Sequence, residues 1–328
     1  MRVPGFDALR AAAALAVVLF HYRGVRAPGD PAVEALSRWP GLDTVVAHGW
    51  LGVDVFFFLS GFLLILPWAR AEASGAALPG LREFYARRIR RLVPGYYVHL
   101  VFLFAFCLPA FMGIAYVGAN AGLVAYNVAM HALFLQFTTP LSAGSFGLNG
   151  ALWTLTLEAE FYLLLPWIAP HVVRAPWRAL AVAAVIGAAW QWLATNDLDA
   201  IVRWQVSLGW RWETSEAAVR DLLAKQLPGF APHFALGMAL GTAWARRPPR
   251  AMHLPILDGA GFAWGARVSY AAYLYHVPLL LIWNRLRILE GSPASLPAFL
   301  FVLAVASTLS WRVIERPFLR EAPRPRRL

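Results

Sequence analysis

Three ionisable residues lie in the first apolar run of the chain, GFDALRAAAALAVVLFHY, where a charge in lipid is costly. Arg10 and His21 are eleven residues apart, about 20° beyond three helical turns, so both project from one face, about 16.5 Å apart along the axis. Asp7 can pair with Arg10. This spacing favours an anion-binding arginine near one end of a span and a titratable histidine half a bilayer away. An interfacial Asp–Arg pair and a histidine at the far headgroups would fit the same pattern.

Four arginines cluster at the start of the third apolar run, in YARRIRRLVPGYY. Arg87 with Arg90, and Arg88 with Arg91, are three residues apart, so their guanidinium groups gather on adjacent helix faces. Guanidinium forks bind phosphate bidentately, and Pro94 could open a pocket by loosening the first turn. A topology anchor, or a contact with anionic headgroups, is the competing interpretation.

Acidic residues occur in the fifth and last apolar runs. In LWTLTLEAEFYLLLP, Glu158 shares a helix face with Tyr162, whereas Glu160 points about 200° away and is expected at the interface. A buried carboxylate needs a partner, so Glu158 should pair with an arginine or histidine or stay protonated. In VIERPF, a structural salt bridge is expected for Glu315 and Arg316 at the cytoplasmic interface.

A polar stripe runs along the eighth apolar run, SYAAYLYHVPLL. Ser269, Tyr273 and His276 lie within about 60° of one another on a helix. His276 could pair with Glu158 or line an acceptor site, and the sequence does not separate these two roles. No role is assigned to the remaining histidines, which are His48, His99, His131, His171, His233 and His253.

The elements that must position these residues are membrane helices. The 328 residues are 59% hydrophobic and only 14% charged, with a mean hydropathy of +0.55, against roughly 25% charged in soluble domains. Such a chain would aggregate as a soluble globule, which excludes a soluble enzyme and a disordered chain. We predict an all-α, polytopic transmembrane helical bundle of about nine to ten spans, forming a single domain over residues 1–328. Nine runs can cross a core of about 30 Å: 6–22, 50–68, 92–113, 117–137, 148–168, 177–195, 227–245, 267–286 and 296–314.

The net charge of +11 is concentrated in three stretches that flank apolar runs: residues 68–91, 246–250 and the basic tail 315–328. This is the positive-inside pattern rather than a nucleic-acid groove, and both termini are expected in the cytoplasm. Counts of crossings from the two ends disagree by one, so a half-crossing within 201–212 or a re-entrant segment near 138–148 is needed. The single cysteine, Cys107, allows no disulfide, and no metal-ligand spacing is present.

Six segments together resemble the integral-membrane acyltransferase family 3, which includes O-antigen and exopolysaccharide O-acetylases and macrolide O-acyltransferases. They occur in family order and cover the chain from the first run to the last. The segments are GFDALR with His21, GVDVFFFLSGFLL at 52–64, ARRIRRLVP at 86–94, LWTLTLEAEFYLLLP at 152–166, SYAAYLYHVP at 269–278 and ERPF at 315–318.

The resemblance implies transfer of an acyl group, usually acetyl, from cytoplasmic acyl-CoA to a hydroxyl of a sugar, polysaccharide, glycolipid or glycoside. It implies a bacterial cytoplasmic membrane and no permanently bound cofactor. His21 would act as general base or as an acyl-accepting nucleophile. Asp7 would orient Arg10, and Glu158 would position the acceptor or tune His21. The phosphates of CoA would be held by Arg10, Arg87, Arg88, Arg90 and Arg91; the acceptor or auxiliary residues would be Tyr162, Ser269, Tyr273, His276 and Glu315.

Two other classes of function fit an apolar chain with intramembrane charges. A transporter or flippase for a small anion or a lipid-linked sugar would use the charges as a translocation path. The chain shows no inverted repeat and no paired broken helices in corresponding halves, which disfavours this class. A non-catalytic scaffold would tolerate replacement of Arg10 and His21.

Overall fold

The computed structural model describes residues 3, 5–26, 29–208, 215–247, 257 and 259–319. Every regular element in these ranges is a helix, which confirms the predicted all-α fold. Residues 248–250 of the second basic stretch, and residues 320–328 of the basic tail, lie outside the described residues. The same holds for 209–212 of the candidate half-crossing 201–212, whose described part lies largely in the nine-residue helix α12 (Asp199–Ser207).

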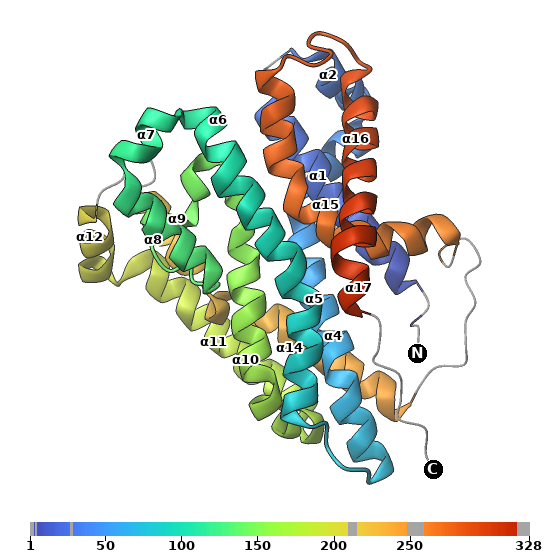
Figure 1. Ribbon diagram of the computed structural model, residues 1–328. Helices are drawn as coiled ribbons and strands as arrows, with labels where there is room; N and C mark the ends of the chain where they lie inside the picture. Colours follow the sequence, from blue (N-terminus) through green and yellow to red (C-terminus); the bar gives the residue numbers. More distant parts are fainter. Residues whose placement is uncertain are drawn as a thin grey trace.

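Eight long helices build the bundle (Figure 1). The third continues from α5 through a π-helical turn, Phe102–Cys107, into α6 (Leu108–Met112), and the last continues from α16 through Trp311–Glu315 into α17 (Arg316–Leu319). Five stretches are long and apolar enough to cross a membrane: Phe6–Val25, Leu51–Ser74, Leu81–Met112, Pro176–Asn196 and Ser295–Leu319. The eight are α1 (Phe6–Val25), α4 (Leu51–Ser74), α5 (Leu81–Val101), α10 (Trp153–Arg174), α11 (Pro176–Asn196), α14 (Leu227–Arg246), α15 (Ala260–Arg285) and α16 (Ser295–Ser310).

The long helices form two groups that α5 runs alongside (Figure 1). In one group α1, α15 and α16 lie together, with α2 (Pro31–Ser37) and α3 (Pro40–Ala47) near the end of α1. In the other, α14 packs against α4, α10 and α11. The start of α1 and the end of α17 lie at the same end of their group, because Arg10 and Leu319 line one cavity. The first and last described helices therefore begin and end on the same side.

The predicted spans 117–137 and 148–168 are wrong as two full crossings. Gly113, with φ of 90°, ends the preceding helix, and Asn120 interrupts the first run, leaving α7 (Ile114–Ala119) and the 12-residue α8 (Ala121–Ala132). At about 18 Å, α8 is too short for a core of about 30 Å. The Tyr96 hydroxyl, near the middle of the continuous helix Leu81–Met112, donates to the carbonyl of His131, so α8 ends halfway along α5.

Helix α10 continues the path of α8 along α5. It begins near the level of α5 at which α8 ends. Asn149 lies 3.1 Å from His99 of α5, and further along the Tyr85 hydroxyl donates to the Leu163 carbonyl, so α10 runs antiparallel to α5. The irregular segment between the halves, with α9 (Pro140–Ala143), is buried in protein, where non-helical backbone at membrane depth is tolerated. Among the described residues, the long helices, with α8 and α10 taken together, are even in number, which agrees with the first and last described helices beginning and ending on the same side.

Glycines allow α4 and α14 to touch backbone to backbone. A Cβ added to Gly61 would lie 2.1 Å from the Phe234 carbonyl oxygen, and one added to Gly237 would lie 2.1 Å from the Phe58 carbonyl oxygen. Small residues at such positions are what lets membrane helices approach closely. The contact fixes the register of α4, which carries part of the cavity described below.

We predict that Gly237→Ala forces these helices apart and lowers the free energy of unfolding by about 1–3 kcal/mol, the usual cost of overpacking. The measurement is the melting temperature of the purified protein in detergent. Gly261→Ala in α15 is the matched control, since its new Cβ would meet no atom within 4 Å, and it should not lower the melting temperature. A Gly237→Ala protein as stable as the parent would contradict the close approach.

Candidate active site

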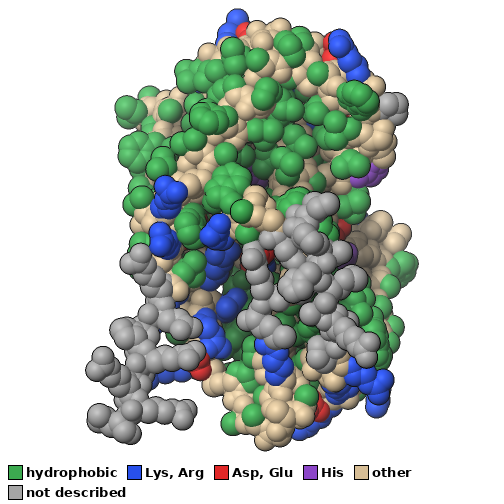
Figure 2. Space-filling model, turned by 90° about the vertical axis from the view of Figure 1, so that its right-hand side faces the viewer, with side chains coloured by type: hydrophobic (Ala, Val, Ile, Leu, Met, Phe, Trp, Pro, Cys, Tyr) green, Lys and Arg blue, Asp and Glu red, His purple; other side chains and the backbone are tan. Residues whose placement is uncertain are grey.

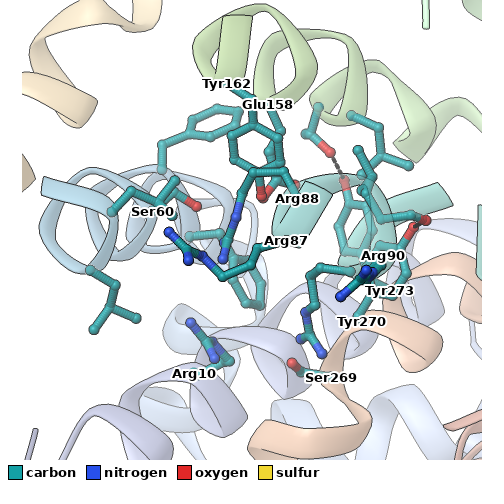
Figure 3. A pocket seen from close by; sticks show the side chains of 18 of the residues that line it. Arg10, Ser60, Arg87, Arg88, Arg90, Glu158, Tyr162, Ser269, Tyr270 and Tyr273 are labelled. Carbon is teal, nitrogen blue, oxygen red and sulfur yellow. Dashed lines mark hydrogen bonds between the residues drawn. The ribbon is translucent and has the colours of Figure 1, made fainter. Parts of the chain in front are cut away.

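A cavity of about 510 Å³ lies between α1, α4, α5, α10, α15 and α17, and we call it the arginine pocket (Figure 3). Among the described lining residues there are five arginines and one carboxylate. Figure 2 shows Lys and Arg side chains gathered around a hollow in the lower half of one face, below a mainly hydrophobic surface. The pocket brings together nine of the predicted site residues: Arg10, Arg87, Arg88, Arg90, Arg91, Glu158, Tyr162, Ser269 and Tyr273.

Aromatic rings hold the guanidinium groups of α5. Arg88 lies over the ring of Tyr162 at 5.8 Å, and its Nε is buried without a hydrogen-bond partner. Arg91 lies over the ring of Tyr270 at 5.8 Å, an arrangement in which ring and cation attract. Arg87 pairs with Glu83 on the same helix. Figure 3 shows Arg10, from α1, on the opposite side of the cavity from Arg87, so cations face the cavity from two helices.

Glu158 belongs to the arginine pocket and not to a histidine pair. Its carboxylate accepts a hydrogen bond from the Tyr162 hydroxyl one turn along α10. The charges of Glu158 and of Asp7 both act on Arg10, as does that of Arg91. Asp7 itself is not among the lining residues. The described hydrogen-bond contacts of His276 are with His21 and Tyr273 and not with Glu158, whereas Glu158 lines the pocket together with five arginines.

The salt bridge predicted for Glu315 forms with a different partner. Glu315 is 1% exposed and lies 4.0 Å from Arg91 of α5, while its neighbour Arg316 lies over the ring of Trp311 at 5.6 Å. The π-helical turn Trp311–Glu315 turns the carboxylate inward. Glu315 therefore supports Arg91 from behind and does not line the cavity.

His21 and His276 meet outside the pocket lining. His276 Nε2 lies 3.3 Å from His21 Nδ1, and the ring centroids are 4.9 Å apart. His276 Nδ1 lies 2.7 Å from the Tyr273 carbonyl oxygen, and His21 Nδ1 lies 2.9 Å from that of Val17. Because a carbonyl oxygen only accepts, both Nδ1 atoms carry the proton in the neutral rings. The lone pair of His21 is then on Nε2, the form that a base or nucleophile needs.

Helices α1 and α15 connect the arginine pocket to this histidine pair. Arg10 lines the pocket, and His21 lies about 16 Å further along the same helix. On α15, Tyr273 lines the pocket with its side chain and accepts the His276 hydrogen bond with its carbonyl. Thr154 lies 2.7 Å from the Tyr273 hydroxyl, which fixes that ring. The two parts of the site are thus held at a set separation by two helices in contact.

Three residues of this region, Tyr270, Asp54 and His233, are not among the predicted site residues. Tyr270 lines the arginine pocket, and its hydroxyl donates a hydrogen bond to the Leu92 carbonyl at 2.7 Å. Its position directly after Ser269 of the polar stripe is the sequence feature that could have indicated it. Asp54 is an ionisable residue inside the apolar run GVDVFFFLSGFLL, and it lies 3.8 Å from His233 of α14. An acid in such a run requires a reason, so the first half of that pair is readable from the sequence.

Comparisons with known proteins give one family match and several distant relatives. A family model described as an acyltransferase domain matches residues 3–266. The peptidoglycan O-acetyltransferase OatA of Listeria monocytogenes is 29% identical over 171 residues, 50% of this chain and 24% of that protein. The O-acetyltransferase OatA of Staphylococcus aureus strain NCTC 8325 is 29% identical over 183 residues, 51% of this chain and 24% of that protein. YrhL of Bacillus subtilis strain 168 is 27% identical over 191 residues, 56% of this chain and 27% of that protein. The chain thus matches about a quarter of the length of these relatives, and no solved structure is significantly similar to it.

Proposed function

The chain belongs to acyltransferase family 3, and from this we propose that it is a membrane-bound O-acyltransferase that moves an acyl group from acyl-CoA to a hydroxyl of a carbohydrate. The names of the OatA relatives favour acetyl as the group and a cell-wall glycan as the acceptor. The observation that carries the proposal is the placement of one helix, α1, with Arg10 in a cationic pocket and an unprotonated Nε2 on His21 three turns away.

The arginine pocket suits the phosphates of a CoA donor. Five guanidinium groups around one carboxylate leave the cavity strongly cationic, and guanidinium forks bind phosphate oxygens bidentately. His21 lies about 16 Å from Arg10 along α1, so a donor that reaches both must be long, with its anionic end and its reactive end apart. Acyl-CoA has this form. Because acyl-CoA is made in the cytoplasm, we place the pocket on the cytoplasmic side, together with the start of α1 and the end of α17.

In the proposed reaction His21 Nε2 takes the proton of the acceptor hydroxyl as its oxygen attacks the thioester carbonyl. The carbon–sulfur bond breaks, and the proton passes from His21 to the departing thiolate, so ester and thiol are the only products. The same lone pair could attack the thioester first and form an acyl-imidazole. In either case the Nδ1–H of His21 is shared between the Val17 carbonyl and His276 Nε2, and both acceptors stabilise the positive charge that develops on the ring.

The proposal is tested by mass spectrometry of cell-envelope glycans from cells with and without the gene. We expect one acyl group per modified unit, present with the gene and absent without it, and not restored by a His21→Ala copy. Unchanged glycans would contradict an envelope acceptor. Substrate flux across liposomes containing the purified protein, without any acyl donor, would instead favour the transporter class.

His276 is proposed as a positioning residue, and its replacement should separate turnover from donor binding. Loss of one hydrogen bond to a charged ring costs about 1.5–3 kcal/mol, so His276→Ala should lower kcat by about 10- to 100-fold. His276→Gln should recover part of this loss, because its amide oxygen can accept the Nδ1–H of His21. The Kd for acetyl-CoA should not change, since His276 is not in the arginine pocket. Equal loss in both variants, together with a lower melting temperature, would indicate a structural role only.

A further inference from the structure

A second acid–histidine pair, which the proposed reaction does not use, lies at the start of α4. Asp54 Oδ1 is 3.8 Å from His233 Nε2 of α14, and the two side chains are 22% and 39% exposed. The Nδ1 of His233 is buried, whereas its Nε2 and the Asp54 carboxylate are too far apart to hydrogen-bond each other. A pair placed only to stabilise two helices would be closer and fully satisfied, because polar atoms in an apolar bundle are costly unless bonded. The pair therefore has hydrogen-bonding capacity left for a ligand.

Aromatic rings adjoin the Asp54–His233 pair. The ring of Phe230 lies 5.3 Å from that of His233 and 5.3 Å from that of Trp153. The ammonium group of Lys225 lies over Trp153 at 5.9 Å. We call Trp153 and Phe230 the aromatic platform. A flat ring face beside a carboxylate and an imidazole offers an apolar surface together with directed hydrogen bonds, the combination by which binding sites hold amphipathic ligands.

The aromatic platform adjoins the arginine pocket. Phe57, which lines the pocket, has its ring 5.1 Å from that of Phe230. The start of α4 also packs on α1, because a Cβ added to Gly49 would lie 2.9 Å from the Cβ of Phe20, the residue before His21. The helix that carries Asp54 therefore contacts both parts of the proposed active site, while Asp54 itself faces α14.

We propose that Asp54, His233 and the aromatic platform bind a sugar ring of the acceptor. Sugar hydroxyls can donate to the Asp54 carboxylate and pair with Nε2 of His233, while the C–H face of the ring packs on Trp153 and Phe230. This chemistry distinguishes a glycan from a lipid chain, which offers no hydroxyls, and from a polyanion, which the carboxylate would repel. The inference deepens the proposed function in naming the ligand as acceptor, but the binding itself requires no acyl transfer.

The test measures glycan binding to the purified full chain in nanodiscs without any acyl donor. The probes are N-acetylchitotetraose and maltotetraose, titrated by saturation-transfer NMR. We expect at least one probe to bind the parent protein, and Asp54→Asn to weaken it about tenfold or more, equivalent to about 1.4 kcal/mol. His233→Gln should do the same, and the double variant should bind more weakly than either single variant, because each residue makes its own hydrogen bond to the ligand. Glu290→Gln, at an exposed carboxylate paired with Arg287, is the matched control and should bind as the parent does.

Two results would overturn the inference. One is binding of neither oligosaccharide to the parent protein, and the other is equal binding to the parent and to Asp54→Asn. If Asp54→Asn lowers the melting temperature, the His233→Gln variant is used in its place, provided that it is as stable as the parent. Equal binding to the parent and to His233→Gln would then overturn the inference. Failure of the proposed function can be distinguished from failure of this inference. If the parent protein binds glycan through Asp54 but transfers no acyl group, the binding site is supported and the proposed reaction is contradicted. Where transfer is measured, Asp54→Asn should raise the acceptor KM and leave the donor KM unchanged.

Discussion

Replacing His21 with alanine is expected to abolish acyl transfer while acetyl-CoA still binds. The Nε2 of His21 carries the lone pair because Nδ1 faces the Val17 carbonyl and His276. Removal of a general base costs about 10²- to 10⁴-fold in rate, and removal of a covalent nucleophile costs more. The check is transfer of labelled acetyl by the purified protein, with donor Kd measured on the same sample. The Kd should stay at the parental value, because the arginine pocket does not include His21.

The matched control for this variant is His48→Ala. His48 Nδ1 lies 2.9 Å from the carbonyl of Thr44, four residues earlier, which is the same local hydrogen bond that His21 makes. His48 is assigned no part in the site, so its alanine variant should retain parental transfer. A His21→Ala protein that transfers acetyl at the parental rate would remove His21 from the reaction.

The second large effect is expected at the donor site. Replacing Arg10 and Arg88 together with glutamine should reduce acetyl-CoA affinity by about 10²- to 10⁴-fold, since each charge-assisted hydrogen bond to phosphate contributes about 1.5–3 kcal/mol. A protein with Arg10→Lys in place of Arg10→Gln should recover only part of the lost acetyl-CoA affinity, because an ammonium group lacks the bidentate fork of a guanidinium group. Binding isotherms in nanodiscs provide the measurement.

Two controls separate donor binding from membrane topology. Arg82→Gln changes an arginine of the same helix, α5, that does not line the cavity, and it should leave the Kd unchanged. Arg91 should be tested as Arg91→Gln with Glu315→Gln, so that no buried carboxylate loses its cation. If the arginine variants insert incorrectly and yet bind acetyl-CoA as the parent does, the cluster is a topology anchor and the donor site lies elsewhere.

Much of the fold can be predicted from local sequence patterns, and the main error of that prediction also has a local cause. Apolar runs of about 20 residues become helices wherever nothing interrupts them. The run 117–137 has the composition of a span, but Asn120 interrupts the helix, and the Tyr96 contact with His131 places the end of α8 halfway along the continuous helix Leu81–Met112. Hydropathy averages over a window and does not register such breaks.

Within the site, the sequence predicts what shares a helix and misses what crosses between helices. The spacing of Arg10 and His21 on α1 is a property of any helix, and the structure keeps it. The partners of His21 and of Glu315 lie on other elements, at His276 and at Arg91, so they depend on packing that a single sequence does not specify. The sequence shows an acidic residue, Asp54, inside an apolar run, but only the structure shows that His233 lies next to it.

Acetyl transfer with purified components is the decisive measurement for the proposed role of His21. The parent protein in nanodiscs is mixed with acetyl-labelled acetyl-CoA and with envelope glycans extracted from cells lacking the gene. We predict alkali-labile label on the glycan and an equal amount of free CoA thiol, with neither product from His21→Ala. Unlabelled glycans from the parent with acetyl-CoA bound, or labelling by His21→Ala at the parental rate, would contradict the proposed reaction.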